Sequence, residues 1–111
     1  MLDLKFTACV EACNACFVTC NHCAAACLKE GDVKMMARCI ALDIDCAAVC
    51  TLVAGAMARG SEHATAICRV CAEVCDACAT ECGKHKMDHC RECAAACRRC
   101  ADECRKMAAM A

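Results

Sequence analysis

Polar and apolar positions along the chain follow a three-four rhythm in four stretches, and in three of them cysteine holds the repeating face. Steps that alternate between three and four residues are typical of the inward seam of an α-helix packed in a bundle. Leucine or isoleucine would ordinarily stand there. The three cysteine seams are Cys9, Cys13, Cys16, Cys20, Cys23 and Cys27; Cys68, Cys71, Cys75, Cys78 and Cys82; and Cys90, Cys93, Cys97, Cys100 and Cys104.

Short glycine-bearing and polar segments separate the stretches and predict helices over about 3–29, 33–59, 62–82 and 87–107. Gly31 is placed to end the first helix as a left-handed cap and the second helix is expected to end at Gly60, while Asp32 and Ser61 are placed to cap the helices that follow. Because the connections are short, neighbouring helices must run antiparallel. The predicted fold class is therefore all-α: an antiparallel up-down-up-down four-helix bundle with a cysteine-lined core, in one domain over 1–111.

The second predicted helix differs from the other three. An acid, Asp43, falls on its seam, where it can accept a hydrogen bond, bind metal, or show that the helix is rotated so that Leu42 faces inward. A second stripe points away from the thiols and indicates a subunit interface, formed by Ile44, Ala48 and Leu52. The seam in phase with its cysteines reads Met36, Cys39, Asp43, Cys46, Cys50, Val53 and Met57.

The two ends of the predicted bundle differ in chemistry. In an antiparallel arrangement the apolar side chains of Phe6, Val53, Met57 and Met107 gather at one end, and we expect them to plug it. Soft and polar ligands gather at the opposite end, namely Cys27, Met36, Cys82, His85, Met87, His89 and Cys90.

Composition narrows the function classes. The net charge is −1 with both signs interspersed, which argues against a nucleic-acid partner. The N-terminus lacks the features of a secretory signal, and the longest apolar stretch, 49–58, is too short to span a bilayer, so we expect a cytoplasmic protein without a membrane partner. In that reducing compartment nineteen cysteines indicate metal binding rather than a disulfide scaffold, and no haem or iron–sulfur motif occurs.

The spacing of the thiols favours Cu(I). Residues four apart on a helix have Cβ atoms about 5–6 Å apart, so two thiolates can clasp one ion and a facing helix can add a third. Low coordination by soft sulfur suits Cu(I), whereas zinc requires four ligands in a tetrahedron. One Cu(I) per thiolate also leaves the core near neutral, while tetrathiolate zinc leaves about −2 per site. We therefore expect multiple Cu(I) ions per chain, bound by all nineteen cysteines.

Residues other than cysteine are weaker candidates for metal binding or uptake. His85 and His89 lie four apart beside Cys90, where they can guide metal inward. The remaining candidates are Met36 and Met87 near the same end, Asp43 on the seam, and His22 one turn inside the first helix.

The chain resembles the bacterial copper storage proteins, and the likeness is closer to the cytosolic branch of that family. The resemblance rests on the cysteine seams, on the run CIALDIDCAAVC over 39–50, and on CGKHKMDHC over 82–90. It implies a four-helix bundle whose lumen holds many Cu(I) ions, assembled as a homotetramer, with metal taken up at the end that bears His85 and His89. The leading hypothesis is thus a cytosolic Cu(I) storage or buffering protein.

An alternative hypothesis is a zinc-binding or thiol-redox module used for interaction or sensing. It predicts a few tetrahedral sites, or a partner whose binding depends on thiol oxidation. No paired base, nucleophile elbow or cofactor motif gives the thiols a catalytic chemistry, so we expect no enzyme and no catalytic residues. The sequence does not identify a copper chaperone or recipient.

Overall fold

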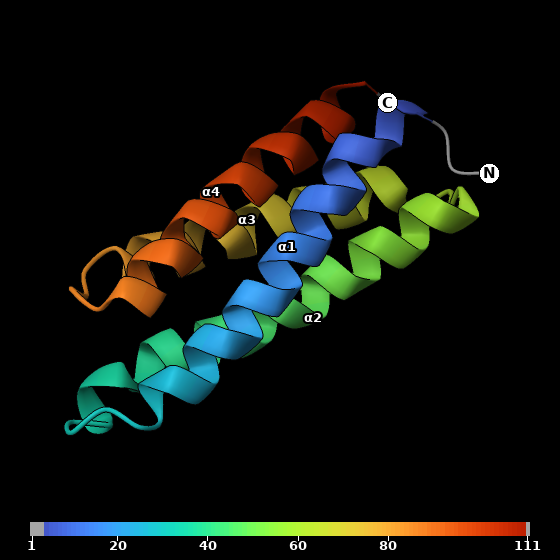
Figure 1. The fold of residues 1–111 in the computed structure, drawn as a ribbon. Coiled ribbons are helices and arrows are strands. Elements are labelled where there is room, and N and C mark those ends of the chain that lie inside the picture. The colour runs from blue at the N-terminus through green and yellow to red at the C-terminus, as the bar shows by residue number, and fades with distance from the viewer. Residues whose placement is uncertain (1–3, 111) are drawn as a thin grey trace.

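Four antiparallel helices make up the computed structural model, which describes residues 4–110 (Figure 1). They are α1 (Leu4–Cys27), α2 (Ala37–Arg59), α3 (Ala64–Cys82) and α4 (Asp88–Ala109), with a single 3₁₀ turn, η1 (Lys34–Met36), before α2. The predicted all-α bundle is confirmed. The first predicted helix was to begin at residue 3, which lies outside the described residues.

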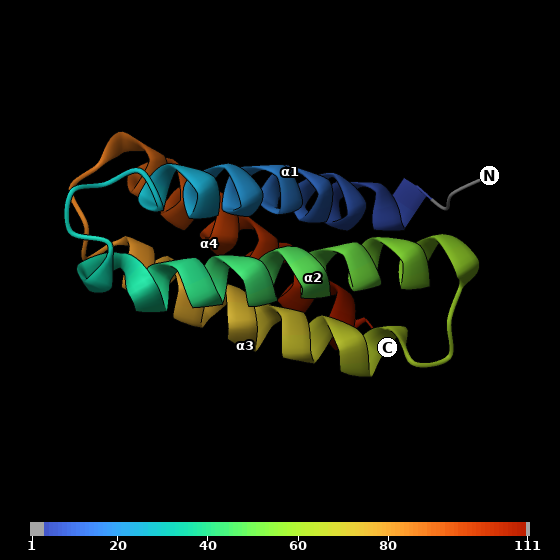
Figure 2. The ribbon, with the colours of Figure 1, turned by 90° about the horizontal axis from the view of Figure 1, so that it is seen from below.

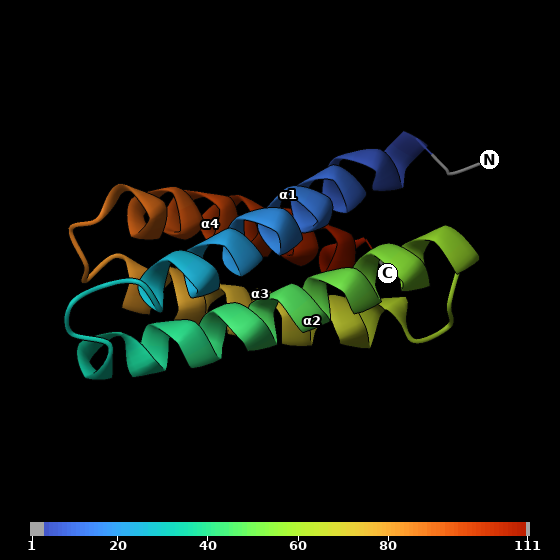
Figure 3. The same ribbon diagram turned by 60° about the horizontal axis from the view of Figure 1, so that its bottom comes forward.

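Each helix packs against two neighbours, so that α1, α2, α3 and α4 close a ring around one core. The bundle measures 45 × 22 × 18 Å, long and narrow as expected for helices of about 20 residues. Figures 2 and 3 show the α1–α2 and α3–α4 connections at one end and the α2–α3 connection at the other. We call the first the histidine end and the second the methionine end.

The left-handed cap forms at Gly60 and not at Gly31, where it was predicted. Gly60 closes α2 with φ +64° and ψ +43°, and the Ser61 N–H donates to the Ala56 carbonyl at 2.9 Å. Gly31 has no positive φ, so the prediction of a left-handed cap there is wrong. The reason is that α1 ends earlier, at Cys27, where tighter bonds close the last turn: the Glu30 N–H donates to the Cys27 carbonyl at 3.2 Å.

The polar capping residues act on turns rather than on the helices themselves. Asp32 Oδ1 accepts a hydrogen bond from the Met35 N–H at 3.2 Å, which stabilises η1, and α2 begins only at Ala37. Ser61 Oγ accepts from the His63 N–H at 3.1 Å, and α3 begins at Ala64. Both helices therefore start later than the predicted residues 33 and 62, because each polar side chain first satisfies a turn.

The segment Lys34–Arg59 is long and apolar enough, by length and composition, to cross a membrane, with a mean hydropathy of 1.9. The sequence expectation rested on the uninterrupted apolar stretch 49–58, which is too short, whereas cysteines, alanines, methionines and aliphatic residues keep the mean hydropathy high over this longer segment. In the bundle these same residues form the inward seam of α2, where Cys39, Cys46 and Cys50 are fully buried. Only 39% of the apolar window is buried, because apolar residues such as Ile44 and Leu52 lie on the outer face of the same helix.

Candidate metal centre

The core of the bundle is built from sulfur. Every one of the nineteen cysteines has no exposed surface, and all are free thiols. The spaces between the seams are filled by small side chains such as Ala12, Ala47, Ala72 and Ala101, all buried, which let the helices approach closely. The cysteine seams therefore face the core, as their spacing predicted, and together they form a column of thiols along the bundle axis.

Neighbouring sulfurs are separated by 3.3 to 4.0 Å, both along helices and between them. With a metal–sulfur bond of about 2.3 Å, two ligands of a trigonal site lie about 4.0 Å apart and those of a tetrahedral site about 3.8 Å. The sulfurs are therefore close enough to share ions without rearrangement of the backbone. The distances alone admit either coordination number, so the choice of metal rests on how the sulfurs are shared.

Sulfurs belong to more than one potential site. Groups of four lie with all their ligand atoms within 4.8 Å of one another, and three of the groups in the middle of the column overlap. Cys16 and Cys46, for example, take part in two groups, and Cys20 and Cys97 also recur. The groups include Cys13, Cys71, Cys100 and Cys104; Cys16, Cys46, Cys50 and Cys75; Cys16, Cys20, Cys46 and Cys97; Cys20, Cys78, Cys93 and Cys97; and Cys23, Cys27, Cys39 and Cys90.

Asp43 lies fully buried among the thiols, on the inward seam that the sequence assigned to it. Its Oδ1 accepts hydrogen bonds from the thiols of Cys93 at 3.1 Å and Cys78 at 3.2 Å. Leu42 stays only partly buried, so the seam is not rotated toward it. Burial away from water, reinforced by Cys93, raises the pKa of Asp43 to about 10. The carboxyl group is therefore neutral near pH 7 in the metal-free protein.

His89 belongs to the thiol cluster at the histidine end. Its Nδ1 lies 3.5 Å from Cys90 Sγ, 3.6 Å from Cys23 Sγ and 3.9 Å from Cys27 Sγ. Its Nε2 lies 2.9 Å from Oε1 of Glu30, which accepts the Nε2–H hydrogen bond. That bond leaves the Nδ1 lone pair directed at the sulfurs, the arrangement by which an outer carboxylate orients a metal-binding imidazole.

His85 occupies a different position from His89, although the sequence grouped them. Its Nε2 lies 2.9 Å from Oε2 of Glu81, and its side chain is only 8% exposed. Glu81 also pairs with Arg38 and Lys84, each at 3.6 Å. No sulfur contact is recorded for His85 among the described residues. It instead lines a pocket of about 570 Å³ at the same end, with Met35, Glu81, Lys84, Lys86 and Met87.

The remaining methionines and histidines differ in how far they are buried. Met36 is fully buried and Met87 partly buried against the core, so both thioethers lie near the histidine end as the sequence suggested. His22 is exposed on the outer surface of α1, and the structure does not bring it to the thiols. His63 is likewise exposed, at the methionine end, where it pairs with Glu62 at 3.3 Å.

The sequence analysis did not predict a role for two glutamates at the histidine end, Glu30 and Glu81. Glu81, in the last turn of α3, stands four residues before His85 in the following connection, so this short sequence spacing could have revealed the pair. Glu30 and His89 are 59 residues apart, and no local signal connects them. Only the folded bundle, which brings the end of α1 against the start of α4, places them together.

Thiol protonation also follows from burial. Removal from water raises the pKa of Cys90 to about 11 and raises that of Cys27 further, reinforced in both by neighbouring Cys39. These two thiols are therefore protonated at neutral pH in the metal-free protein. Each must give up its proton to become a metal ligand.

Comparison with known proteins agrees with this geometry. The profile of a family described as "Copper storage protein" matches residues 3–109. An uncharacterized cysteine-rich protein of Bacillus subtilis, YhjQ, is 50% identical over 102 residues, which cover 92% of this chain and 94% of that protein.

Solved structures are similar over nearly the whole bundle. The Cu(I)-bound copper storage protein BsCsp3 superposes with a TM-score of 0.90 at 48% identity, covering 94% of this chain and 98% of that one. A cytosolic copper storage protein from Streptomyces lividans, solved with five coppers, gives a TM-score of 0.91 at 40% identity, covering 95% of this chain and 92% of that one. Fold, thiol column and sequence together show that the chain belongs to the copper storage protein family.

Proposed function

We propose that this protein stores or buffers Cu(I), holding many ions per chain on the thiolates of its core. The observation that carries the proposal is the overlap of the four-thiol groups along the bundle axis. A chain of shared sulfurs suits a metal that accepts bridging thiolates at low coordination number. Zinc would need four sulfurs around each ion, so the same column would hold fewer zinc ions than Cu(I) ions.

Charge supports the same metal. With one Cu(I) for each thiolate the filled core is near neutral, and it requires no buried cation to balance it. Among the buried residues of the described chain the charged types are only Asp43 and Glu81, and Glu81 lies at the histidine end beside Arg38 and Lys84. A core of dianionic zinc sites would lack counter-charges there.

The proposed ligand set consists of all nineteen cysteines, with His89 added at the histidine end. We propose that metal enters at that end, where Nδ1 of His89 faces Cys23, Cys27 and Cys90. His85 acts farther out, on the wall of the neighbouring pocket, where Met87 offers a thioether, and Met36 offers a second thioether from the core. Asp43 hydrogen-bonds the thiols that will become ligands, and can itself become an oxygen ligand once they are metallated. His22, on the outer surface, has no part in this set.

Anaerobic titration of the reduced protein with Cu(I), against a competing chelator, tests the proposal. The expected result is continued uptake well beyond the capacity of any single four-thiol group. Saturation at one or two ions per chain would overturn the proposal. A parallel titration with zinc separates the alternative function, because a zinc module would saturate at a few ions and compete with copper.

We further propose that four copies assemble through the outward stripe of α2. Ile44 and Leu52 are 57% and 49% exposed, and a pocket of about 180 Å³ beside them is lined by Val49, Leu52, Ala66, Ile67 and Val70. An apolar surface of this extent on a charged bundle is suited to burial against another copy. Light scattering of the double variant Ile44→Glu, Leu52→Glu is expected to show a smaller assembly; a wild-type mass would contradict the assignment.

The compartment and the absence of turnover belong to the same proposal. The Streptomyces lividans relative is described as cytosolic, and a reducing cytosol would keep the thiols ready for metal. Storage requires uptake, retention and release, with no bond made or broken in a substrate. We expect the copper donor and recipient to be proteins that exchange Cu(I) through soft ligands.

A further inference from the structure

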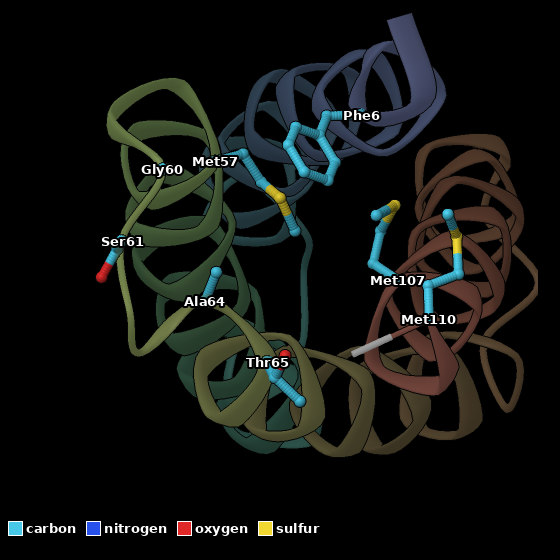
Figure 4. A pocket seen from close by; sticks show the side chains of 8 residues that line it. All are labelled: Phe6, Met57, Gly60, Ser61, Ala64, Thr65, Met107 and Met110. Atoms are coloured by element: carbon cyan, nitrogen blue, oxygen red, sulfur yellow. The ribbon is translucent and has the colours of Figure 1, made fainter. Parts of the chain in front are cut away.

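The methionine end contains a pocket where the sequence predicted a plug. Its volume is about 270 Å³, and it is lined by Phe6, Met57, Gly60, Ser61, Ala64, Thr65, Met107 and Met110. Figure 4 shows Phe6, Met57 and Met107 extending from three different helices toward a common space, with Met110 beside Met107. The predicted gathering of apolar residues is correct, but they surround an opening rather than fill it.

The lining offers soft ligands and no charge. Of the eight lining residues none is acidic or basic, and the only polar side chains are the hydroxyls of Ser61 and Thr65. Ser61 Oγ already accepts a hydrogen bond from the His63 N–H. The thioethers of Met57, Met107 and Met110 are therefore the principal donor atoms facing the pocket. Soft thioethers select Cu(I) over the hard divalent cations.

The floor of this pocket is one helical turn from the thiol column. Cys9 follows Phe6 by three residues on α1, and Cys104 precedes Met107 by three on α4, so each pair shares a helix face. Cys9 Sγ and Cys104 Sγ lie 3.9 Å apart. Cys68 of α3, three residues after Thr65, interacts with both and completes the outermost thiol group at this end.

We propose that Met57, Met107 and Met110 form a second Cu(I) site, through which the thiol column exchanges metal at the end opposite the histidines. This inference rests on the proposed storage function and extends it from one opening to two. The ligand is a bare monovalent soft cation, Cu(I), with Ag(I) as its redox-inert substitute.

Because the lining carries no charge, we expect Cu(I) to bind at this site only transiently. Thioethers are neutral, so binding releases no proton and leaves the +1 charge uncompensated in an apolar pocket. When the ion moves on to a thiol of the Cys9, Cys68 and Cys104 group, the thiol loses its proton to solvent, and the resulting Cu(I)–thiolate is neutral. Copper stays in the same oxidation state throughout. The ion is therefore held less firmly at the thioethers than one turn deeper.

Methyl NMR of protein labelled at the methionine ε-carbons tests the site during anaerobic titration with Ag(I) and then Cu(I). The expected result is a shift of the Met57, Met107 and Met110 methyl signals while thiols are still being filled. The matched control is Met35→Leu: Met35 is 55% exposed, like Met110 at 59%, but lies at the histidine end. That variant is expected to leave the three shifts unchanged.

The triple variant Met57→Leu, Met107→Leu, Met110→Leu keeps side-chain volume and every thiol. It is expected to reach the wild-type copper capacity but to load more slowly, with circular dichroism confirming the fold. The inference is overturned if many ions bind while the three wild-type methyl signals stay fixed until the thiols are full. Saturation of the wild type at one or two ions would instead overturn the storage function itself, so the two failures are distinguishable.

Discussion

At the scale of single residues, the buried Asp43 couples the protonation of the core to its stability. A carboxyl group with a pKa of about 10 in the fold and about 3.9 in the unfolded chain holds a proton that the unfolded chain releases. Stability from this group is fully present below about pH 4 and is lost as pH rises toward 10. In the metal-free protein Asp43 therefore costs stability at neutral pH.

Replacement of Asp43 by Asn, which keeps the shape without the ionisation, should flatten this dependence. Between pH 5 and 7.5 the free energy of unfolding of the metal-free wild type should fall by up to about 1.4 kcal/mol per pH unit more than that of the variant. Urea denaturation under reducing, metal-free conditions measures both. Other titrating groups are common to the two proteins, so parallel slopes would show that Asp43 is not held neutral.

Glu30 is predicted to set the orientation and tautomer of His89. Glu30→Ala removes the acceptor of the Nε2–H bond, so the proton can move to Nδ1 and block the nitrogen that faces Cys23 and Cys90. Loss of such an outer partner typically lowers metal affinity about 10–100-fold. We expect a loss of this size for ions bound at the histidine end, measured by chelator competition, together with mixed His89 tautomers in ¹⁵N NMR.

Two controls accompany that prediction. Glu30→Gln retains an acceptor oxygen and should recover most of the affinity and the Nε2–H tautomer. Glu11→Ala removes an exposed carboxylate from α1, the helix that precedes Glu30, and should leave both readouts unchanged. If Glu30→Ala behaves like Glu11→Ala, then the thiols alone fix the geometry at this end.

At the scale of elements, the two glycines that follow α1 and α2 are not equally important for ending the helices. Gly60 has the left-handed conformation that a Cβ disfavours, whereas Gly31 has neither a positive φ nor an atom within 4 Å of the position of a Cβ. Gly60→Ala should therefore destabilise the protein by about 1–2 kcal/mol. Gly31→Ala should be neutral or stabilise it by up to about 1 kcal/mol, by restricting the unfolded chain. Chemical denaturation compares the two; equal effects would contradict the assigned cap.

The same contrast shows what the sequence can and cannot predict. The seam spacing predicted which face of each helix is buried, because any cysteine shifted by one residue would leave that face. It could not tell Gly31 from Gly60, since helix ends depend on local competition between turn and helix bonds. It also missed the Glu30–His89 bond and the space among the methionines, because both depend on how separate helix ends meet in three dimensions.

At the scale of the whole molecule, neutral thiols let the core persist without metal. Protonated cysteine packs like a small apolar side chain, and the buried alanines let the helices approach. We expect the reduced, metal-free protein to show a helical circular dichroism spectrum with a cooperative thermal transition. A mostly coiled spectrum that becomes helical only with Cu(I) would instead place the protein among those whose metal drives folding.

Because neighbouring thiol groups share sulfurs such as those of Cys16 and Cys46, or have sulfurs 3.6 Å apart, a bound ion can advance by exchanging one sulfur at a time. It need never be hydrated on the way. Ions that enter one after another then redistribute over the shared sulfurs. The copper content therefore varies continuously and is not fixed ion by ion to separate sites. A recipient touching either end would draw on the common pool and not on the ion that happened to settle nearest.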